Sequence, residues 1–166
     1  MAELRGNFAL NDEDEDTQKG KYLTFQLDHE IFGMEIKFVT EIIGIQPITY
    51  VPEVPVYVKG IINLRGQIIP VIDLRLRFKK EPMEYNDRTC IVILDIKDIT
   101  IGLIVDFVAE VVKIDDENIV PPPNYRAGFH NPYIKGIGKN GNDIKLLLDC
   151  EKIISEDELD VLSEIK

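Results

Sequence analysis

The sequence predicts a mainly β protein built from two similar halves, each a small barrel or sandwich of short strands. Three observations lead to this fold class. Two stretches of the chain recur in the same order, and apolar and polar residues alternate with the period of a strand through both copies. The strand-like runs are also separated by Gly and Asn turns at intervals of about 8 to 12 residues, a spacing typical of small barrels and sandwiches.

The internal repeat is visible in two pairs of segments. GMEIKFVTEII, starting at Gly33, is matched by GLIVDFVAEVV, starting at Gly102. Further along the chain, YVKGI, starting at Tyr57, is matched by YIKGI, starting at Tyr133. Because two spaced matches occur in one order, we expect the two halves to share one fold, with about seven additional residues in the second half.

This pattern divides the chain into three parts. A repeated domain is expected over residues 21–150, made of two similar β subdomains at about 21–83 and 84–150. Residues 1–20 contain the run DEDED and no apolar face that could offset the entropy cost of ordering, so we expect a disordered acidic arm. Residues 151–166 are predicted to form a short amphipathic helix, because a Ser-x-x-Glu capping box precedes an apolar stripe.

The first half predicts two hairpins. YLTFQLDHEIFGMEI, from Tyr22, alternates as a strand, breaks at the polar DHE and then resumes. GIINLRGQIIPVI predicts two strands joined at Arg65 and Gly66, where Gly66 has a structural role because it supplies the positive φ of a tight turn. Pro70 cannot donate to a ladder, so we expect its strand at a sheet edge or a bulge. KFVTEII, between the hairpins, fits either one helical turn or a strand.

The second half repeats this arrangement. TCIVILDIKDITIGLIV predicts a hairpin with DIKD as its turn, and YIKGIGKNGNDIKLLLD predicts another around Asn140 and Gly141. The C-terminal helix is expected to begin near Ser155, with acidic residues in its first turn, where the helix dipole favours them.

The net charge of −11 argues against nucleic-acid binding once the charges are counted along the chain. Residues 1–20 carry six acids and two bases, and residues 149–166 carry seven acids and two bases. The remaining residues carry seventeen acids and fifteen bases, so no part offers the Lys and Arg excess that neutralises phosphates. Cys90, Cys150 and the two distant histidines match neither a disulfide framework nor a metal pattern, so we expect no metal and no cofactor.

No apolar run approaches the roughly 20 residues that a membrane-spanning helix requires. The N-terminal sequence MAELRGNFALNDEDED also lacks the basic start and apolar middle of a signal peptide. We therefore expect a cytoplasmic protein without direct membrane insertion, monomeric when isolated.

An enzyme hypothesis finds few candidate residues. The only serines, Ser155 and Ser163, belong to the predicted terminal helix, which argues against a serine nucleophile. The repeat places Asp73 and Asp149 at equivalent strand ends, so a hydrolase with a carboxylate pair remains one alternative and structural capping the other. GIINLRG lacks the Lys and the Ser or Thr of a phosphate-binding loop.

A docking module fits the sequence better. The two hairpins beginning at Tyr57 and Tyr133 share their scaffold but differ at their tips, because GIINLRG carries Arg65 where GIGKNGN carries none. Arginine is enriched among the interface residues that contribute most to binding. A generic SH3-like module that binds peptides is the alternative within this class.

Several segments resemble the CheW family, the coupling proteins of bacterial chemotaxis: GMEIKFVTEIIG, VKGIINLRGQIIPVIDLRLRF, YNDRTCIVIL and IGLIVDFVAEVV. The resemblance covers about residues 21–165. It implies two five-stranded SH3-like β-barrel subdomains packed on a shared core, with a short C-terminal helix. It also implies a non-enzymatic adaptor that couples the cytoplasmic helical tip of chemoreceptors to the regulatory domain of the histidine kinase CheA.

The resemblance also implies the residues of both binding surfaces. The receptor would bind in the groove between the subdomains, at Arg65, Val39, Val108 and Val111, and Gly60 would be a packing position that accepts no side chain.

The kinase would bind at Ile36, Glu41 and Tyr125. In this interpretation Arg65 is a polar anchor beside an apolar groove that takes a helical partner.

Overall fold

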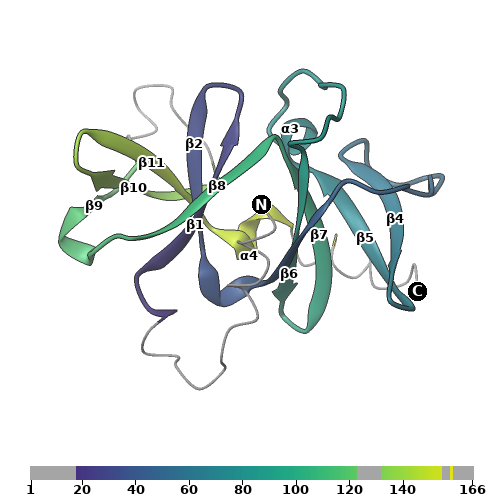
Figure 1. Ribbon diagram of the computed structural model, residues 1–166, viewed down its shortest axis with the longest axis horizontal. Helices are drawn as coiled ribbons and strands as arrows, with labels where there is room; N and C mark the ends of the chain where they lie inside the picture. Colours follow the sequence, from purple (N-terminus) through teal and green to yellow (C-terminus); the bar gives the residue numbers. More distant parts are fainter. Residues whose placement is uncertain (1–17, 123–131, 155–157, 159–166) are drawn as a thin grey trace.

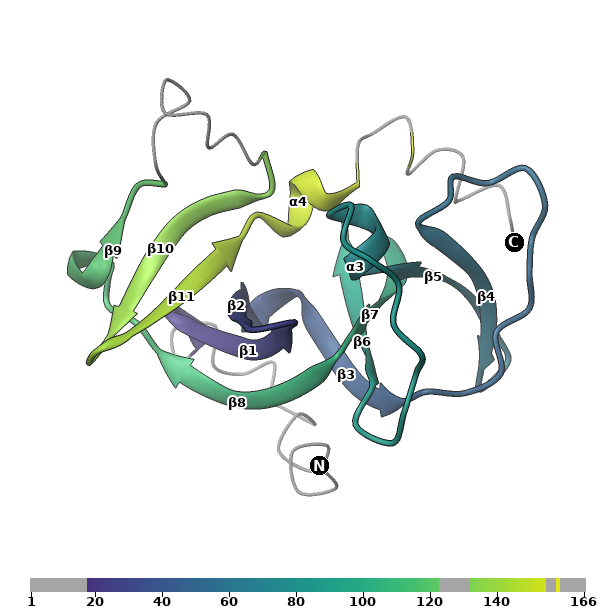
Figure 2. The ribbon, with the colours of Figure 1, turned by 90° about the horizontal axis from the view of Figure 1, so that it is seen from above.

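The structure is a computed structural model that describes residues 18–122, 132–154 and 158. Two β-sheets lie side by side (Figures 1 and 2). The six-stranded sheet has the order β8-β1-β2-β11-β10-β9, and the five-stranded sheet has the order β3-β6-β7-β5-β4. The predicted mainly β fold of two subdomains is confirmed, and the two-residue strand β9 adds a sixth strand to one sheet.

The strands of the six-stranded sheet are β1 (Lys21–Leu27), β2 (Glu30–Glu35), β8 (Phe107–Lys113), β9 (Ile119–Val120), β10 (Ile134–Asn140) and β11 (Asp143–Leu148). The strands of the five-stranded sheet are β3 (Val39–Gly44), β4 (Val58–Leu64), β5 (Gln67–Asp73), β6 (Cys90–Ile96) and β7 (Ile99–Val105). The short helices are η1 (Ile36–Phe38), α3 (Leu74–Arg77), η2 (Asp116–Asn118) and α4 (Cys150–Ile153).

Each sheet takes strands from both sequence halves, which differs from the expected division at about 21–83 and 84–150. β3 leaves its own hairpin and pairs with β6, and β8 in the second copy leaves its hairpin and pairs with β1. The later hairpins also cross over, because β5 pairs with β7 and β11 pairs with β2, both in parallel. A repeat in the sequence shows which segments are alike, but not which copy each segment pairs with.

The register shows that the two copies exchange strands in the same way. Val71 lies opposite Gly102 in one sheet, and Leu147 lies opposite Gly33 in the other. The two glycines are counterparts, because they begin the first pair of repeated segments. Val71 and Leu147 are also counterparts, because they hold the same place after YVKGI and YIKGI. The two halves are therefore interlocked copies of one pattern.

Most of the predicted hairpins have the expected bounds, and the structure decides two local alternatives that the sequence left open. KFVTEII forms both of the alternatives, one 3-10 turn (η1) followed by β3. Pro70 does not lie on an edge strand, because β5 is flanked by β4 and β7, but a β-bulge between Val58 and Gly60 of β4 lies next to Ile61, the partner of Pro70. Its missing N–H is tolerated because the pairing with β7 begins only at Val71, the next residue.

The C-terminal prediction is only partly within the described residues. α4 (Cys150–Ile153) is a separate short turn capped by Asp149, and it lies within the predicted C-terminal segment but before the helix expected to begin near Ser155. The predicted capping box at Ser155 lies outside the described residues except for Glu158, and so does the acidic arm as far as residue 17.

A shared core lies between the sheets and draws buried side chains from both. Its largest fully buried members include Phe25 and Leu27 of β1 and Leu94 of β6. On the same interface, the Arg77 guanidinium lies 4.3 Å from the ring centre of Tyr57 and 5.1 Å from that of Tyr133. These tyrosines are counterparts in the repeat, so one cation joins the starts of both later hairpins.

Candidate functional site

The tip of the β4–β5 hairpin presents Arg65 to solvent. Arg65 and Gly66 both have positive φ, 50° and 89°, as a two-residue hairpin turn requires. The Asn63 Oδ1 atom accepts a hydrogen bond of 2.8 Å from the Gly66 N–H and stabilises this turn. The Arg65 side chain is 69% exposed and pairs with Glu41 of β3. An exposed ion pair of this kind contributes little to stability, which leaves the guanidinium available to a partner.

Gly60, at the start of the same hairpin, has no room for a side chain. A Cβ atom there would lie 2.0 Å from the backbone oxygen of Thr49, and its φ is +148°. The close approach follows from the bridge between Thr49 and Ile61, which brings the preceding loop against β4.

The other sequence-predicted residues are not all at the surface. Val111 is 37% exposed on β8, an edge strand of its sheet, and Val39 is partly buried against the shared core. Val108 is 1% exposed and Ile36 is 3% exposed, so both belong to the core and neither forms part of a binding surface in this conformation.

The remaining two kinase-facing predictions are also not brought together. Glu41 lies beside Arg65, a residue assigned to the other partner, rather than on a separate surface. Tyr125 lies outside the described residues. The predicted kinase set of Ile36, Glu41 and Tyr125 is therefore not a surface that the structure shows.

An apolar surface that sequence reasoning missed lies in the loop between β3 and β4. Tyr50 is 74% exposed and Val56 is 80% exposed. We call the surface formed by Tyr50, Val54, Pro55 and Val56 the loop patch; together with Val58 and Lys59 it lines a cavity of about 350 Å³. The signal for it was the run ITYVPEVPVY, whose apolar residues stand in a Pro-interrupted loop and cannot be buried by strand alternation.

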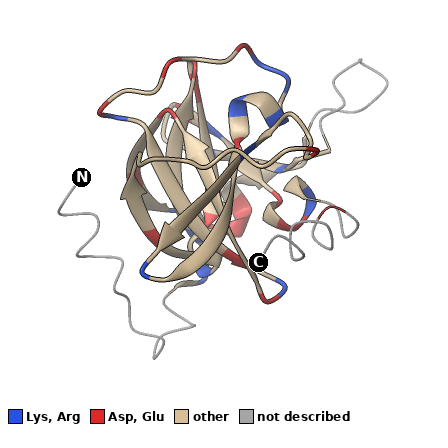
Figure 3. Ribbon diagram, turned by 90° about the vertical axis from the view of Figure 1, so that its right-hand side faces the viewer, with Lys and Arg blue, Asp and Glu red and all other residues tan. Residues whose placement is uncertain are grey.

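The loop patch and the Arg65 tip lie at opposite ends of β4. Val56 comes just before the first residues of the strand, and Arg65 comes just after the last. A seven-residue strand spans about 20 Å. In Figure 3 the ribbon is coloured for Lys, Arg, Asp and Glu mainly at turns, loops and short helices, and most of the strand ribbon is tan.

A second polar cluster lies where the two sheets meet. The Arg75 guanidinium donates to both carboxylate oxygens of Asp106, with Nε to Oδ1 at 2.8 Å, and also pairs with Asp28. Burial alone would raise the pKa of the Asp28 carboxyl, but the hydrogen bond and charge of Arg75 outweigh it and the pKa is lowered. The cluster ties the β1–β2 turn to the junction of β7 and β8.

The two aspartates of the hydrolase hypothesis have structural roles. Asp73 caps α3 by accepting a hydrogen bond of 2.9 Å from the Arg75 N–H, and its second oxygen accepts one of 2.7 Å from the Tyr85 hydroxyl. Asp149 caps α4 by accepting one of 3.1 Å from the Glu151 N–H. Equivalent capping in both copies explains why the repeat keeps an aspartate at this position.

The described ranges contain neither a metal cluster nor a membrane-spanning helix. Among those residues, no three or more His, Cys, Asp or Glu side chains are grouped so that they could hold a metal ion. Within the same part of the chain, no helix is long and apolar enough to cross a membrane.

Comparisons with known proteins match this architecture. The family model of the CheW-like domain matches residues 21–158. The chain is 35% identical to the chemotaxis protein CheW of Treponema pallidum over 161 residues, which cover 95% of this chain and 92% of the relative. It is 32% identical to the chemotaxis protein CheW of Klebsiella aerogenes over 145 residues, 87% of each chain.

A solved structure agrees with the fold as well. The crystal structure of the scaffolding protein TtCheW from Thermoanaerobacter tengcongensis superposes with a TM-score of 0.72 at 37% identity, covering 78% of this chain and 88% of that one. The fold has two interlocked β subdomains and an exposed hairpin tip, and the family model matches most of the chain. The protein therefore belongs to the CheW family of chemotaxis scaffold proteins.

Proposed function

We propose that this protein is a non-catalytic adaptor that couples the cytoplasmic helical tip of chemoreceptors to the histidine kinase CheA. The observation that carries the proposal is the presence of two exposed surfaces at opposite ends of β4, the Arg65 tip and the loop patch. A bridging protein requires two surfaces far enough apart for both partners to bind at once.

The Arg65 tip is the proposed receptor surface. Its guanidinium is exposed, and Glu41 beside it holds the side chain near the sheet instead of leaving it free in solvent. Val39, two residues before Glu41 on β3, is partly buried, and Val111 on β8 of the other sheet is 37% exposed; both stay predicted apolar contacts of the receptor. A charged anchor next to apolar side chains suits an amphipathic helix.

The loop patch is the proposed kinase surface. Tyr50 and Val56 are the two most exposed of the large apolar side chains in the described part of the chain. Exposed apolar side chains that gather in one loop typically mark a protein interface. The patch replaces Ile36 as the apolar kinase contact, because Ile36 is buried. Tyr125 stays a prediction for the same partner.

The mechanism that follows is scaffolding in the cytoplasm. When one molecule binds both partners, each raises the effective concentration of the other near its binding site. A change in the receptor can then alter the equilibrium of the kinase through coupled binding free energies, and no covalent bond is formed or broken on the adaptor.

Binding of purified partners to two surface variants tests this assignment. Val56→Asp places a charge in the loop patch and should abolish capture of the CheA regulatory domain while leaving receptor binding unchanged. Arg65→Glu should have the opposite pattern. Failure of the unmodified protein to bind either partner would reject the adaptor function, and capture of proline-rich peptides instead would favour the generic SH3-like module.

A further inference from the structure

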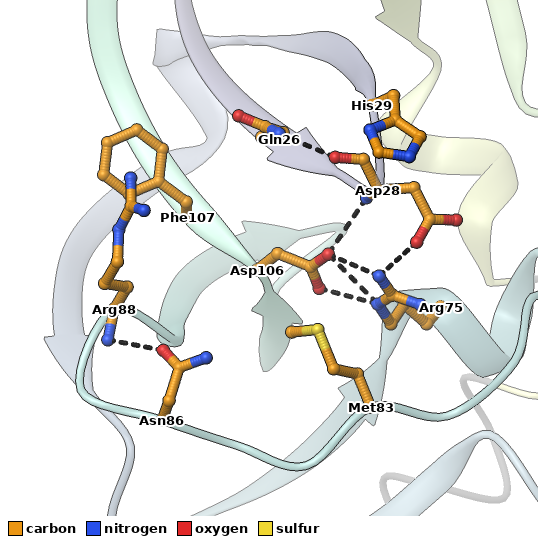
Figure 4. Close-up of a pocket in the computed structure, with 9 residues that line it drawn as sticks. All are labelled: Gln26, Asp28, His29, Arg75, Met83, Asn86, Arg88, Asp106 and Phe107. Carbon is orange, nitrogen blue, oxygen red and sulfur yellow. Dashed lines mark hydrogen bonds and ion pairs between the residues drawn. The ribbon is translucent and has the colours of Figure 1, made fainter.

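A cavity of about 350 Å³ opens at the contact between the two sheets (Figure 4). It is bounded by the β1–β2 turn, by the junction of β7 and β8, and by the loop that follows α3. Arg75, Asp28 and Asp106 form one wall, Arg88 and Phe107 form another, and Met83 lies between them. A volume of this size accommodates a side chain of a partner together with its apolar neighbour.

The wall formed by Arg75 has no capacity for another anion. Its Nε and Nη2 atoms donate to Asp106, Nη2 also donates to Asp28, and Nη1 donates to the backbone oxygen of Glu81 at 2.8 Å. Lys80, 2.9 Å from a carboxylate oxygen of Glu30, adds a further cation beside Asp28. The charges of this wall are therefore matched within the protein.

The opposite wall has unused capacity for an anion. The Arg88 guanidinium carbon lies 4.0 Å from the centre of the Phe107 ring, so the ring holds one face of the planar group. The other arginines of the described ranges, at positions 65, 75 and 77, each pair with a carboxylate, whereas no described residue accepts a hydrogen bond from the Arg88 guanidinium. A stacked guanidinium presents its N–H groups along its edge, in the fork that matches a carboxylate.

We infer that this cavity binds an acidic side chain of the chemoreceptor tip, with Arg88 as the anchor and Phe107 as the platform that orients it. The inference rests on the proposed function, because the cavity lies between the sheets, where the receptor is expected to bind. Met83 and Phe107 add apolar contacts, so the acidic residue of the receptor should have an apolar neighbour on the same helix face. Arg88 is thus a specificity residue for this partner in addition to Arg65.

The test measures the affinity of a labelled receptor-tip fragment for the full chain by fluorescence anisotropy. Arg88→Glu should weaken binding by on the order of tenfold or more, since it replaces attraction by repulsion at the contact. Arg88→Lys should also weaken binding, because an ammonium lacks the bidentate fork. Lys139→Glu is the matched control, since it makes the same charge change on the exposed tip of β10, away from the cavity, and it should alter the affinity less than about twofold.

Three further results separate the possible outcomes. Reversing the charge of the responsible receptor acid should restore binding to the Arg88→Glu variant. Equal affinities for Arg88→Glu and Lys139→Glu would overturn the inference while leaving the adaptor function intact. If the unmodified chain binds the CheA regulatory domain but not the receptor fragment, the receptor assignment fails and this inference fails with it.

Discussion

The two sheets share one repeat but fill their interiors differently. In the five-stranded sheet the second cluster of buried residues is entirely aliphatic: Ile62, Ile69, Val71, Ile91, Ile93 and Ile104. At the positions of the six-stranded sheet that the repeat aligns with these, the chain has, in the same order, Gly138, Lys145, Leu147, Tyr22, Thr24 and Glu35. The repeat therefore specifies the strand pairing, while the interior of each copy is free to diverge.

This difference matters for function because both proposed docking surfaces lie on the aliphatic sheet. Arg65 and the loop patch border β4, whose Ile62 belongs to the aliphatic cluster and whose Leu64 packs against it. Binding residues on loops need a rigid support to hold their positions. The six-stranded sheet instead has a smaller second cluster of Tyr22, Ile114 and Leu147, together with partly exposed ion pairs such as Lys135 with Glu35, which are weak.

The largest expected effect on stability comes from giving a buried position of the five-stranded sheet the residue of its counterpart in the six-stranded sheet. Ile69 is fully buried, whereas its counterpart Lys145 is 7% exposed and tolerated. Ile69→Lys would bury a charge without a partner, so the loss in the free energy of unfolding should exceed the roughly 2 to 5 kcal/mol typical of an Ile→Ala change. Urea denaturation measures it. A loss below about 1 kcal/mol would show that the two interiors are interchangeable.

Glycines at matching positions should also differ in their tolerance. Gly60→Ala places a Cβ atom 2.0 Å from a backbone oxygen at positive φ, whereas at Gly136 the nearest atom is a methyl group of Ile119 at 3.0 Å. We expect Gly60→Ala to destabilise the protein by about 3 kcal/mol and Gly136→Ala by about 1 kcal/mol. Thermal unfolding followed by circular dichroism would measure both changes. Similar losses at the two positions would contradict the difference in packing.

The reverse exchange should have a smaller effect of opposite sign. Lys145 lies 3.9 Å from Asp143, whose side chain is 74% exposed, so the pair is weak. Lys145→Ile should raise the free energy of unfolding by about 1 kcal/mol, because it places apolar surface where the counterpart sheet has Ile69. A decrease in the same urea titration would mean that the lysine ammonium makes a contact on which its sheet depends.

The smallest expected effect concerns acid stability. Burial would raise the pKa of the Glu35 carboxyl, but its hydrogen bond to Lys135 and the charges of Lys135 and Lys37 outweigh it and the pKa is lowered from 4.5. A carboxyl with a lower pKa in the folded state adds stability above its unfolded pKa and loses it as the pH falls through the folded value. Glu35→Gln should therefore reduce stability at pH 7 and flatten its decline below about pH 4.5. An unchanged pH profile would contradict this role. The counterpart of Glu35 in the other sheet is Ile104, which has no carboxyl group and cannot contribute in this way.

More of the fold than of the functional site could be predicted from the sequence. Alternation and turn residues locate the hairpins, because strand period and positive-φ turns are local properties of the chain. The exchange of β3 and β8 between the sheets could not be predicted, since it depends on pairing between distant segments. The burial of Val108 on β8 and of Ile36 in η1 was also not decided by the sequence, because an apolar run suits both a core and a groove.

The loop patch and the stacked pair of Arg88 and Phe107 are two sites that the sequence analysis did not predict. The Pro-interrupted run ITYVPEVPVY was a signal that Tyr50 and Val56 are not buried by strand alternation, but only the structure shows that they gather in one exposed patch. Arg88 and Phe107 are separated in the sequence by the whole β6–β7 hairpin, and their stacking arises only when β8 crosses to the six-stranded sheet. The pair of Arg88 and Phe107 therefore has no local signature in the sequence.

A competition titration tests the central claim that two partners occupy opposite ends of β4 at once. The affinity of the CheA regulatory domain is measured by isothermal calorimetry with and without a saturating amount of receptor-tip fragment. We predict that the kinase domain binds with equal or higher affinity when the receptor is present, and that a ternary complex elutes in gel filtration. Displacement of the kinase domain by the receptor fragment would contradict the account.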